Sequence, residues 1–203
     1  MRRRECLARL GWGLGFCLAA VPAPLWAHQA PAVPPSPWHL PDVKFVPTPL
    51  DVVAAMLRMA TLHEGDVLYD LGSGDGRIPI MAARRYGIEA VGVDIDPRRI
   101  EEANAHAQTA GVSAHVEFVL GDLFTADIRE ATVVTLYLLD VLNERLRPTL
   151  LRDLLPGARV VSHAFRMGDW EPEQTVRVNG RMVYLWTIPE PGTSLPSPPV
   201  PAR

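Results

Sequence analysis

The stretch VLYDLGSGDGRIPI, residues 67–80, constrains the fold of this chain more than any other. An apolar run ends at Asp70, and Gly72, Gly74 and Gly76 follow at alternate positions. Because glycine adopts positive φ without steric cost, the pattern predicts a tight turn between a buried strand and a helix. A backbone this bare also lets a ligand approach closely at the end of the strand.

Strand and helix patterns alternate on both sides of this turn. The expected strands cover residues 66–70, 89–94, 115–120, 131–138 and 158–165, and the expected helices between them cover residues 76–86, 97–111 and 142–155. The strands are apolar nearly throughout, which indicates a parallel sheet covered on both faces.

The two ends of the domain carry their own signals. Thr48 and Pro49 predict the N-cap and first turn of a helix. The apolar face of that helix is expected to hold Val53, Met56, Leu57 and Ala60. Near the other end, Asn179-Gly180 lies between two strand patterns and predicts a hairpin. The predicted fold is α/β, Rossmann-like and doubly wound, with a mostly parallel sheet and a C-terminal antiparallel hairpin.

Proline marks the limits of the folded part. Nine of the 20 prolines fall in residues 22–49 and six in residues 189–201. This composition favours extended chain over a packed core. We therefore expect a linker at residues 28–44, one domain at residues 45–189 and a disordered tail at residues 190–203.

The first 27 residues resemble a signal peptide. Arg2, Arg3 and Arg4 precede a short apolar stretch at residues 10–21, and small Ala27 follows two prolines. A membrane-spanning helix needs about 20 residues, so the stretch is short for a permanent span. We expect residues 1–27 to be a cleaved signal peptide or, alternatively, an N-terminal anchor.

Charge and composition exclude several classes of function. Without residues 1–27 the chain has 16 basic and 22 acidic side chains, and the formal charge shifts from -3 to -6. A body this acidic has no general attraction for nucleic acid. Cys6 and Cys17 both lie in the leading segment, and the six histidines are scattered. We expect no thiol nucleophile and no metal site.

The spacing of the glycines separates this turn from two common nucleotide sites. A dinucleotide site has G-x-G-x-x-G, but Arg77 occupies the third position after Gly74. The chain also lacks the G-x-x-x-x-G-K-[ST] loop of nucleoside triphosphate sites. An acid followed by G-x-G-x-G instead resembles motif I of the class I S-adenosylmethionine-dependent methyltransferases.

Two further acids agree with that resemblance. Asp94 ends the second expected strand, 24 residues after Asp70, and Asp122 follows the third. The resemblance implies that Asp94 binds the ribose hydroxyls of S-adenosylmethionine and that Asp122 meets its adenine amino group. It also implies that Asp70 orients the glycine turn and meets the methionine moiety. Asp75 is either a second such contact or a charge that favours the start of a helix.

Longer segments point to a subfamily. FVPTPLDVVAAMLRMA, VTLYLL, GARVVSHAFRMGDW and YLWTIP resemble the bacterial relatives of the mitochondrial ATP synthase c-subunit lysine methyltransferase family, over residues 45–189. The resemblance implies a protein-lysine N-methyltransferase in which residues 47–49 close over the cofactor. The cofactor-binding residues that it implies are Pro47, Thr48, Asp70, Gly72, Ser73, Gly74, Asp75, Gly76, Asp94, Ile95, Asp122, Leu123, Tyr137 and Leu138.

Tyr137 is the candidate catalytic residue. The resemblance places it in the methyl-transfer channel, where an aromatic rim would keep a lysine amine neutral by desolvation. A core aromatic at the end of a strand is an equally good interpretation. His163 and Asp169 lie near the fifth strand, but we expect neither to shuttle a proton. Residues 166–172 are too few for the helical lid of many small-molecule methyltransferases, and the resulting open site suits a protein acceptor.

The expected partner is a protein substrate, and a membrane protein is one candidate for it. The N-terminal segment could also associate this protein with a membrane. The N-terminal segment predicts an exported, periplasmic location or a membrane anchor. S-adenosylmethionine is made in the cytoplasm, so an anchored domain that stays cytoplasmic is a third interpretation. A non-catalytic domain that binds adenosyl ligands, and a methyltransferase of a small-molecule acceptor, are the alternatives for function.

Overall fold

A computed structural model describes residues 44–193 and residue 195 of the chain. The predictions for the N-terminal segment, nearly all of the linker and most of the tail lie outside these residues. Among the described residues, no helix has the length and apolar character needed to cross a membrane.

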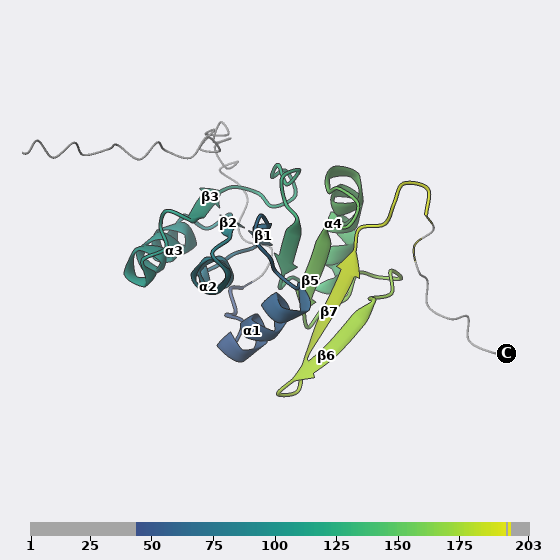
Figure 1. The fold of residues 1–203 in the computed structure, drawn as a ribbon, viewed down its shortest axis with the longest axis horizontal. Coiled ribbons are helices and arrows are strands. Elements are labelled where there is room, and N and C mark those ends of the chain that lie inside the picture. The colour runs from purple at the N-terminus through teal and green to yellow at the C-terminus, as the bar shows by residue number, and fades with distance from the viewer. Residues whose placement is uncertain (1–43, 194, 196–203) are drawn as a thin grey trace, which may run out of the picture. The chain divides into compact units, whose positions relative to one another are not determined.

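Seven strands form one sheet in the order β3-β2-β1-β4-β5-β7-β6 (Figure 1). The strands are β1 (Val67–Leu71), β2 (Glu89–Asp94), β3 (Val116–Leu120), β4 (Val133–Leu136), β5 (Arg159–His163), β6 (Gln174–Val178) and β7 (Arg181–Thr187). The first five pair in parallel, and β7 is antiparallel to both of its neighbours. The predicted fold class is confirmed.

In the described part of the chain, four helices cover the sheet, and each face of the sheet has its own apolar core. They are α1 (Leu50–Met59), α2 (Arg77–Tyr86), α3 (Pro97–Ala110) and α4 (Asp140–Asp153). Side chains of α1, α2 and α3 pack into one core, with Met56 and Leu57 fully buried in it. The other core contains Leu146 and Leu150 of α4 and Trp186 of β7. Both faces of the parallel strands are therefore apolar, as the sequence predicts.

The start of α1 differs from the prediction. The N-cap is Pro49, no side chain caps the helix, and Thr48 lies one position too early. The Thr48 hydroxyl is 3.1 Å from Nδ1 of His163, 115 residues away in the chain. The predicted N-cap role of Thr48 is wrong because a tertiary partner takes its hydroxyl. The predicted apolar face of α1 is confirmed by full burial of Val53, Met56, Leu57 and Ala60.

The structure confirms the hairpin that the sequence predicts near the C-terminus. Asn179 and Gly180 both have positive φ, as a two-residue hairpin turn requires. Residues 164–173, between β5 and β6, contain one isolated bridge, between Met167 and Trp170, and no helix. This connection therefore does not form a helical lid, which agrees with the prediction from its short length.

Candidate functional site

The carboxyl ends of β1, β2 and β4 open into one cavity of about 720 Å³. In a parallel sheet these ends meet at the same edge, which is where ligands of doubly wound folds bind. The turn after β1, the loop after β3 and the first residues after β4 line the cavity. Residues 44–48, which we call the N-terminal arm, line it from a further side.

The glycine turn is tied to β2 by its backbone. The amides of Gly72 and Ser73 donate to the carbonyl of Val93, at 2.8 and 3.0 Å. The amide of Gly74 donates to Oδ2 of Asp94 at 2.8 Å. The turn and the acid at the end of β2 therefore form one rigid unit at the mouth of the sheet.

Gly74 and Gly76 do not line the cavity, although both are predicted cofactor-binding residues. A Cβ at Gly74 would lie 2.2 Å from a ring carbon of Phe45, in the arm. A Cβ at Gly76 would lie 2.5 Å from the ring of Phe118 and 2.8 Å from Cβ of Ala103. In this structure their missing side chains make room for two aromatic rings.

Asp94 and Asp122 both line the cavity, as predicted. Oδ1 of Asp94 accepts from the amide of Asp96 at 2.9 Å, and Oδ1 of Asp122 accepts from the amide of Phe124 at 2.9 Å. These bonds fix both carboxylates, and each oxygen keeps a second lone pair. Either acid can therefore accept a hydrogen bond from a ligand without rearranging.

Asp70 is a buried acid on the cavity wall, 3% exposed. Its Oδ1 accepts from the Thr135 hydroxyl at 2.7 Å. Burial raises the pKa of Asp70 to about 7, and the charges of Asp94 and Asp75 add to this effect. A ligand with a positive charge at this point would favour the ionised carboxylate.

Asp75 is engaged by a neighbouring arginine. Nε of Arg77 donates to Oδ1 of Asp75 at 2.8 Å, and Nη1 donates to the Thr48 carbonyl at 2.9 Å. Burial alone would raise the pKa of Asp75, but the hydrogen bonds from Arg77 outweigh it and lower that pKa. Asp75, Glu102 and His106 place possible ligand atoms within 4.8 Å. Arg77 already balances the Asp75 charge, so we assign no metal there.

A second, smaller cavity lies beside the first, and Lys44, Val46 and Tyr137 line both. The smaller cavity, of about 130 Å³, is lined by Lys44, Val46, Tyr137, Leu139 and Phe165. Tyr137 lines both cavities. Its ring centroid is 3.9 Å from that of buried His163 and 6.0 Å from that of Phe165. The structure thus holds this predicted catalytic residue at the junction of the two spaces.

Every predicted cofactor-binding residue except Gly74 and Gly76 lines the large cavity. Asp169 is exposed and pairs with Arg147 at the surface, so it takes no part in the site. The cavity residues that the sequence analysis missed are Lys44, Phe45, Val46, Arg77, Ile78, Asp96, Arg98, Arg99, Gly121, Phe124, Leu142 and Arg145. Arg77 directly follows the glycine turn, so its place in the cavity lining could have been predicted from the sequence. Phe124 and Arg145 meet only through tertiary contact, at 3.7 Å from ring centroid to guanidinium carbon.

Comparisons with known proteins agree with this geometry. The model of the ANTKMT methyltransferase domain matches residues 70–174. A protein-lysine N-methyltransferase of Saccharolobus islandicus is 46% identical over 75% of this chain and 98% of its own length. The adenine nucleotide translocase lysine N-methyltransferase of mouse is 34% identical over 67% of this chain, which spans 59% of that protein.

A solved structure supports the same assignment. The RNA methyltransferase of Salinibacter ruber, in complex with S-adenosyl-L-homocysteine, is 59% identical with a TM-score of 0.71. The match covers 71% of this chain and 95% of that one. Sheet order, glycine turn and cavity together define a class I S-adenosylmethionine-dependent methyltransferase. The chain belongs to the ANTKMT methyltransferase domain family, and the predicted resemblance is confirmed.

Proposed function

We propose that this protein transfers a methyl group from S-adenosylmethionine to the side-chain amine of a lysine in a protein substrate. The observation that carries the proposal is the position of Tyr137, which lines both cavities. The large cavity would hold the cofactor and the small aromatic one the acceptor. The relatives named as protein-lysine methyltransferases support this choice of acceptor.

The chemistry of the large cavity fits the cofactor. Asp94 would accept hydrogen bonds from the ribose hydroxyls, and Asp122 from the adenine amino group. Asp70 is a buried acid with one hydrogen-bond donor, Thr135, among the described residues. The positive charges of the methionine moiety would compensate its ionisation, which burial otherwise opposes.

Positioning and desolvation would do most of the catalytic work. Bound S-adenosylmethionine supplies an electrophilic methyl group whose C–S bond breaks as the amine nitrogen forms the new N–C bond. The attacking amine must be neutral. The positive charge of Lys44 and the apolar side chains of Val46, Leu139 and Phe165, which line the small cavity, would lower its pKa. Tyr137 would fix the line of approach, which is where near-attack geometry lowers the barrier. The methylated nitrogen then releases its proton to water.

Cofactor affinity is expected to depend on pH through Asp70. Because its pKa is about 7, the carboxyl is mostly neutral at about pH 6 and ionised at about pH 8. The ionised form attracts the positively charged ligand, so Kd for S-adenosylmethionine should fall by up to about tenfold over that range. Titration calorimetry in buffers of different ionisation enthalpy should show proton release near pH 7. Asp70→Asn should bind more weakly and lose this pH dependence; an unchanged dependence would contradict the placement.

Replacing Tyr137 by Ala is expected to lower kcat by about 10- to 100-fold, because misplacement of the acceptor costs near-attack geometry. Kd for the cofactor should change far less. Tyr184→Ala is the matched control, since this half-buried tyrosine packs on Trp186 and lines neither cavity. An equal loss of binding and turnover in Tyr137→Ala would make this tyrosine a core residue.

The class of acceptor is tested directly. Labelled S-adenosylmethionine and the protein are incubated with cell extract, and the label is followed after protease or nuclease treatment. We expect label that is sensitive to protease and that yields N-methyllysine on hydrolysis. Label sensitive to nuclease would support an RNA acceptor, the substrate in the name of the Salinibacter ruber relative. Cofactor binding without any transfer would support a non-catalytic adenosyl-binding domain.

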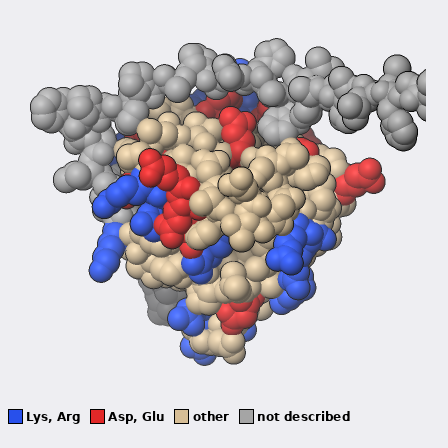
Figure 2. Space-filling view, turned by 90° about the vertical axis from the view of Figure 1, so that its left-hand side faces the viewer, with Lys and Arg blue, Asp and Glu red and all other residues tan. Residues whose placement is uncertain are grey.

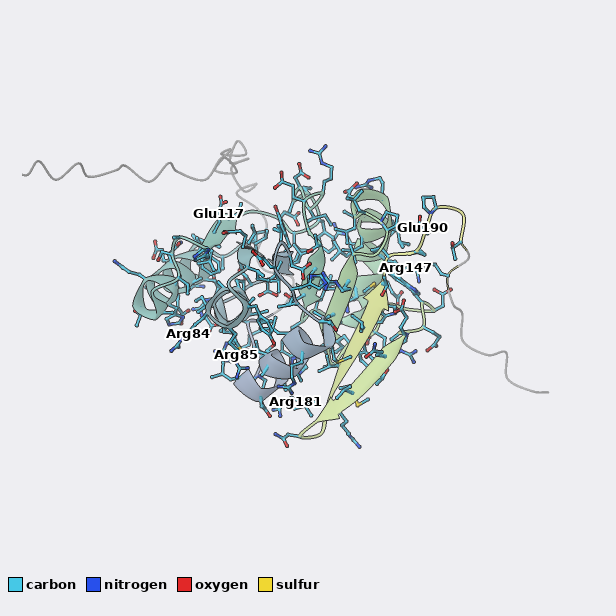
Figure 3. The ribbon with its side chains drawn as sticks, viewed as in Figure 1. Arg84, Arg85, Glu117, Arg147, Arg181 and Glu190 are labelled. Carbon is cyan, nitrogen blue, oxygen red and sulfur yellow. The ribbon has the colours of Figure 1, made fainter. Side chains whose placement is uncertain are left out.

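Surface charge favours protein over RNA. On the α3 side, acidic and basic side chains are interspersed over an otherwise uncharged surface (Figure 2). Arg84 and Arg85 at the end of α2, and Arg181 at the start of β7, lie along the lower edge of the molecule in Figure 3. None of the three lines either cavity. The basic residues that do line the large cavity are Lys44, Arg77, Arg98, Arg99 and Arg145. Five aspartates, Asp70, Asp75, Asp94, Asp96 and Asp122, line it with them, so the described lining of the cavity has no excess of basic side chains.

The N-terminal sequence extends the proposal to location. We propose that residues 1–27 export the domain or associate it with a membrane, which would bring it to a membrane-protein substrate. The arginines that precede the apolar stretch support this placement. Cell fractionation with N-terminal sequencing tests it. A soluble cytoplasmic protein that retains residue 1 would contradict it.

A further inference from the structure

We propose that His163 is a positioning residue that links the N-terminal arm at the large cavity to the orientation of Tyr137 in the small one. The inference rests on the proposed function, because it assigns the cofactor and the acceptor to these two cavities. His163 itself lines neither cavity, so it acts through its neighbours.

The first of its two contacts joins it to the arm. His163 ends β5 and is 1% exposed. Its Nδ1 lies 3.1 Å from the hydroxyl of Thr48, which is itself 4% exposed and lines the large cavity. Arg77 also donates to the Thr48 carbonyl at 2.9 Å. Thr48 is therefore one point where the arm is fastened to the rest of the domain, beside the Phe45 ring, which packs over Gly74.

The second contact joins His163 to Tyr137. The two rings are 3.9 Å apart between centroids and inclined by 31°. Phe165 stacks beside the same tyrosine at 6.0 Å and 27°. His163 and Phe165 are thus the ring neighbours of Tyr137, and a shift of the imidazole would remove the nearer one.

The described residues give the imidazole no second hydrogen bond. Its Nε2 is buried and has no hydrogen-bond partner among the described residues. Burial and the charge of Arg181 lower the pKa of His163 to about 4, although Asp51 acts in the opposite direction. The ring is neutral at physiological pH and is held by Thr48 on one side and Tyr137 on the other. Displacing Thr48 would therefore remove the only side-chain hydrogen bond of the imidazole among the described residues and would change how the ring packs against Tyr137.

Two substitutions separate these contacts. His163→Phe keeps a ring against Tyr137 but removes the hydrogen bond to Thr48. His163→Asn keeps a polar atom near the position of Nδ1 but removes the ring. Thr48→Val removes the same hydrogen bond from the other side. His115→Asn is the control, since His115 is half exposed, bonds Glu89 and lines neither cavity.

Kd for S-adenosylmethionine by titration calorimetry and kcat by labelled methyl transfer are measured on the full chain. His163→Phe and Thr48→Val should each raise Kd about two- to tenfold, the effect of one hydrogen bond. The double variant should be no worse than His163→Phe alone, because both changes remove one interaction. His163→Asn should leave Kd near that of the unchanged protein and lower kcat several-fold. The His115→Asn control should match the unchanged protein in both.

The inference is overturned if His163→Phe and His163→Asn lose binding and turnover in equal proportion, or if the effects of Thr48→Val and His163→Phe add. Melting temperatures identify a variant that fails to fold, and Thr48→Val still tests the hydrogen bond in that case. The proposed function fails in a different way, since the unchanged protein would then not bind S-adenosylmethionine or not transfer its methyl group.

Discussion

Gly76→Ala is expected to lower the free energy of unfolding by about 2–5 kcal/mol. Two effects add at this position. Gly76 has a φ of +77°, where a residue with a side chain costs about 1–2 kcal/mol. The new Cβ would also lie 2.5 Å from the ring of Phe118 and 2.8 Å from Cβ of Ala103, and overpacking of this kind costs about 1–3 kcal/mol. Urea denaturation of both proteins measures the difference.

Gly87→Ala separates the two effects. Gly87 has a similar φ of +67°, but a Cβ there would meet nothing within 4 Å. It should therefore show only the backbone cost, about 1–2 kcal/mol. An equal decrease in the free energy of unfolding in both variants would mean that Phe118 and Ala103 move aside for the new Cβ. Only the positive φ, and not the packing of the turn against β3 and α3, would then require glycine at position 76.

Asp94→Ala is expected to raise Kd for S-adenosylmethionine about 10- to 100-fold. The alanine leaves the ribose hydroxyls without their acceptor, and an unpaired buried polar group costs about 1–3 kcal/mol. It also removes the acceptor of the Gly74 and Asp96 amides, so the glycine turn loses one of its three hydrogen bonds to the end of β2. Titration calorimetry measures the affinity, and thermal melting measures the accompanying loss of stability.

Two further variants sharpen this result. Asp94→Asn keeps one acceptor oxygen and should lie between Asp94→Ala and the unchanged protein. Asp127→Ala also removes a carboxylate, but at an exposed position that pairs with Arg129 and does not line the cavity. Its affinity should not change. Unaltered cofactor affinity in Asp94→Ala would show that the cofactor lies elsewhere.

Much of the fold follows from local signals. Positive φ at Gly72, Gly74 and Gly76 is a property that glycine supplies directly, and the same holds for Asn179-Gly180 in the hairpin. Alternation of apolar strands with helices defines a parallel sheet, because helical connections cover both faces. The acids at the strand ends then meet at one edge, so the position of the large cavity and half of the residues that line it are predicted as well.

Other features have no local signal. Thr48 resembles an N-cap in sequence, but its partner is His163, 115 residues away. Gly74 and Gly76 resemble ligand contacts, but Phe45 and Phe118 fill the space over them. The hydrogen bond of Thr48 and the packing over Gly74 and Gly76 both depend on side chains that belong to distant parts of the chain.

The sequence by itself determined the class of fold, the glycine turn, the order of Asp70, Asp94 and Asp122, and the terminal hairpin. Each depends on backbone conformation or on periodic burial, which neighbouring residues specify. Only the tertiary structure decided that Tyr137 joins two cavities and that His163 stands between it and the arm. Such contacts join residues far apart in the chain, and their geometry is set by the packing of whole elements.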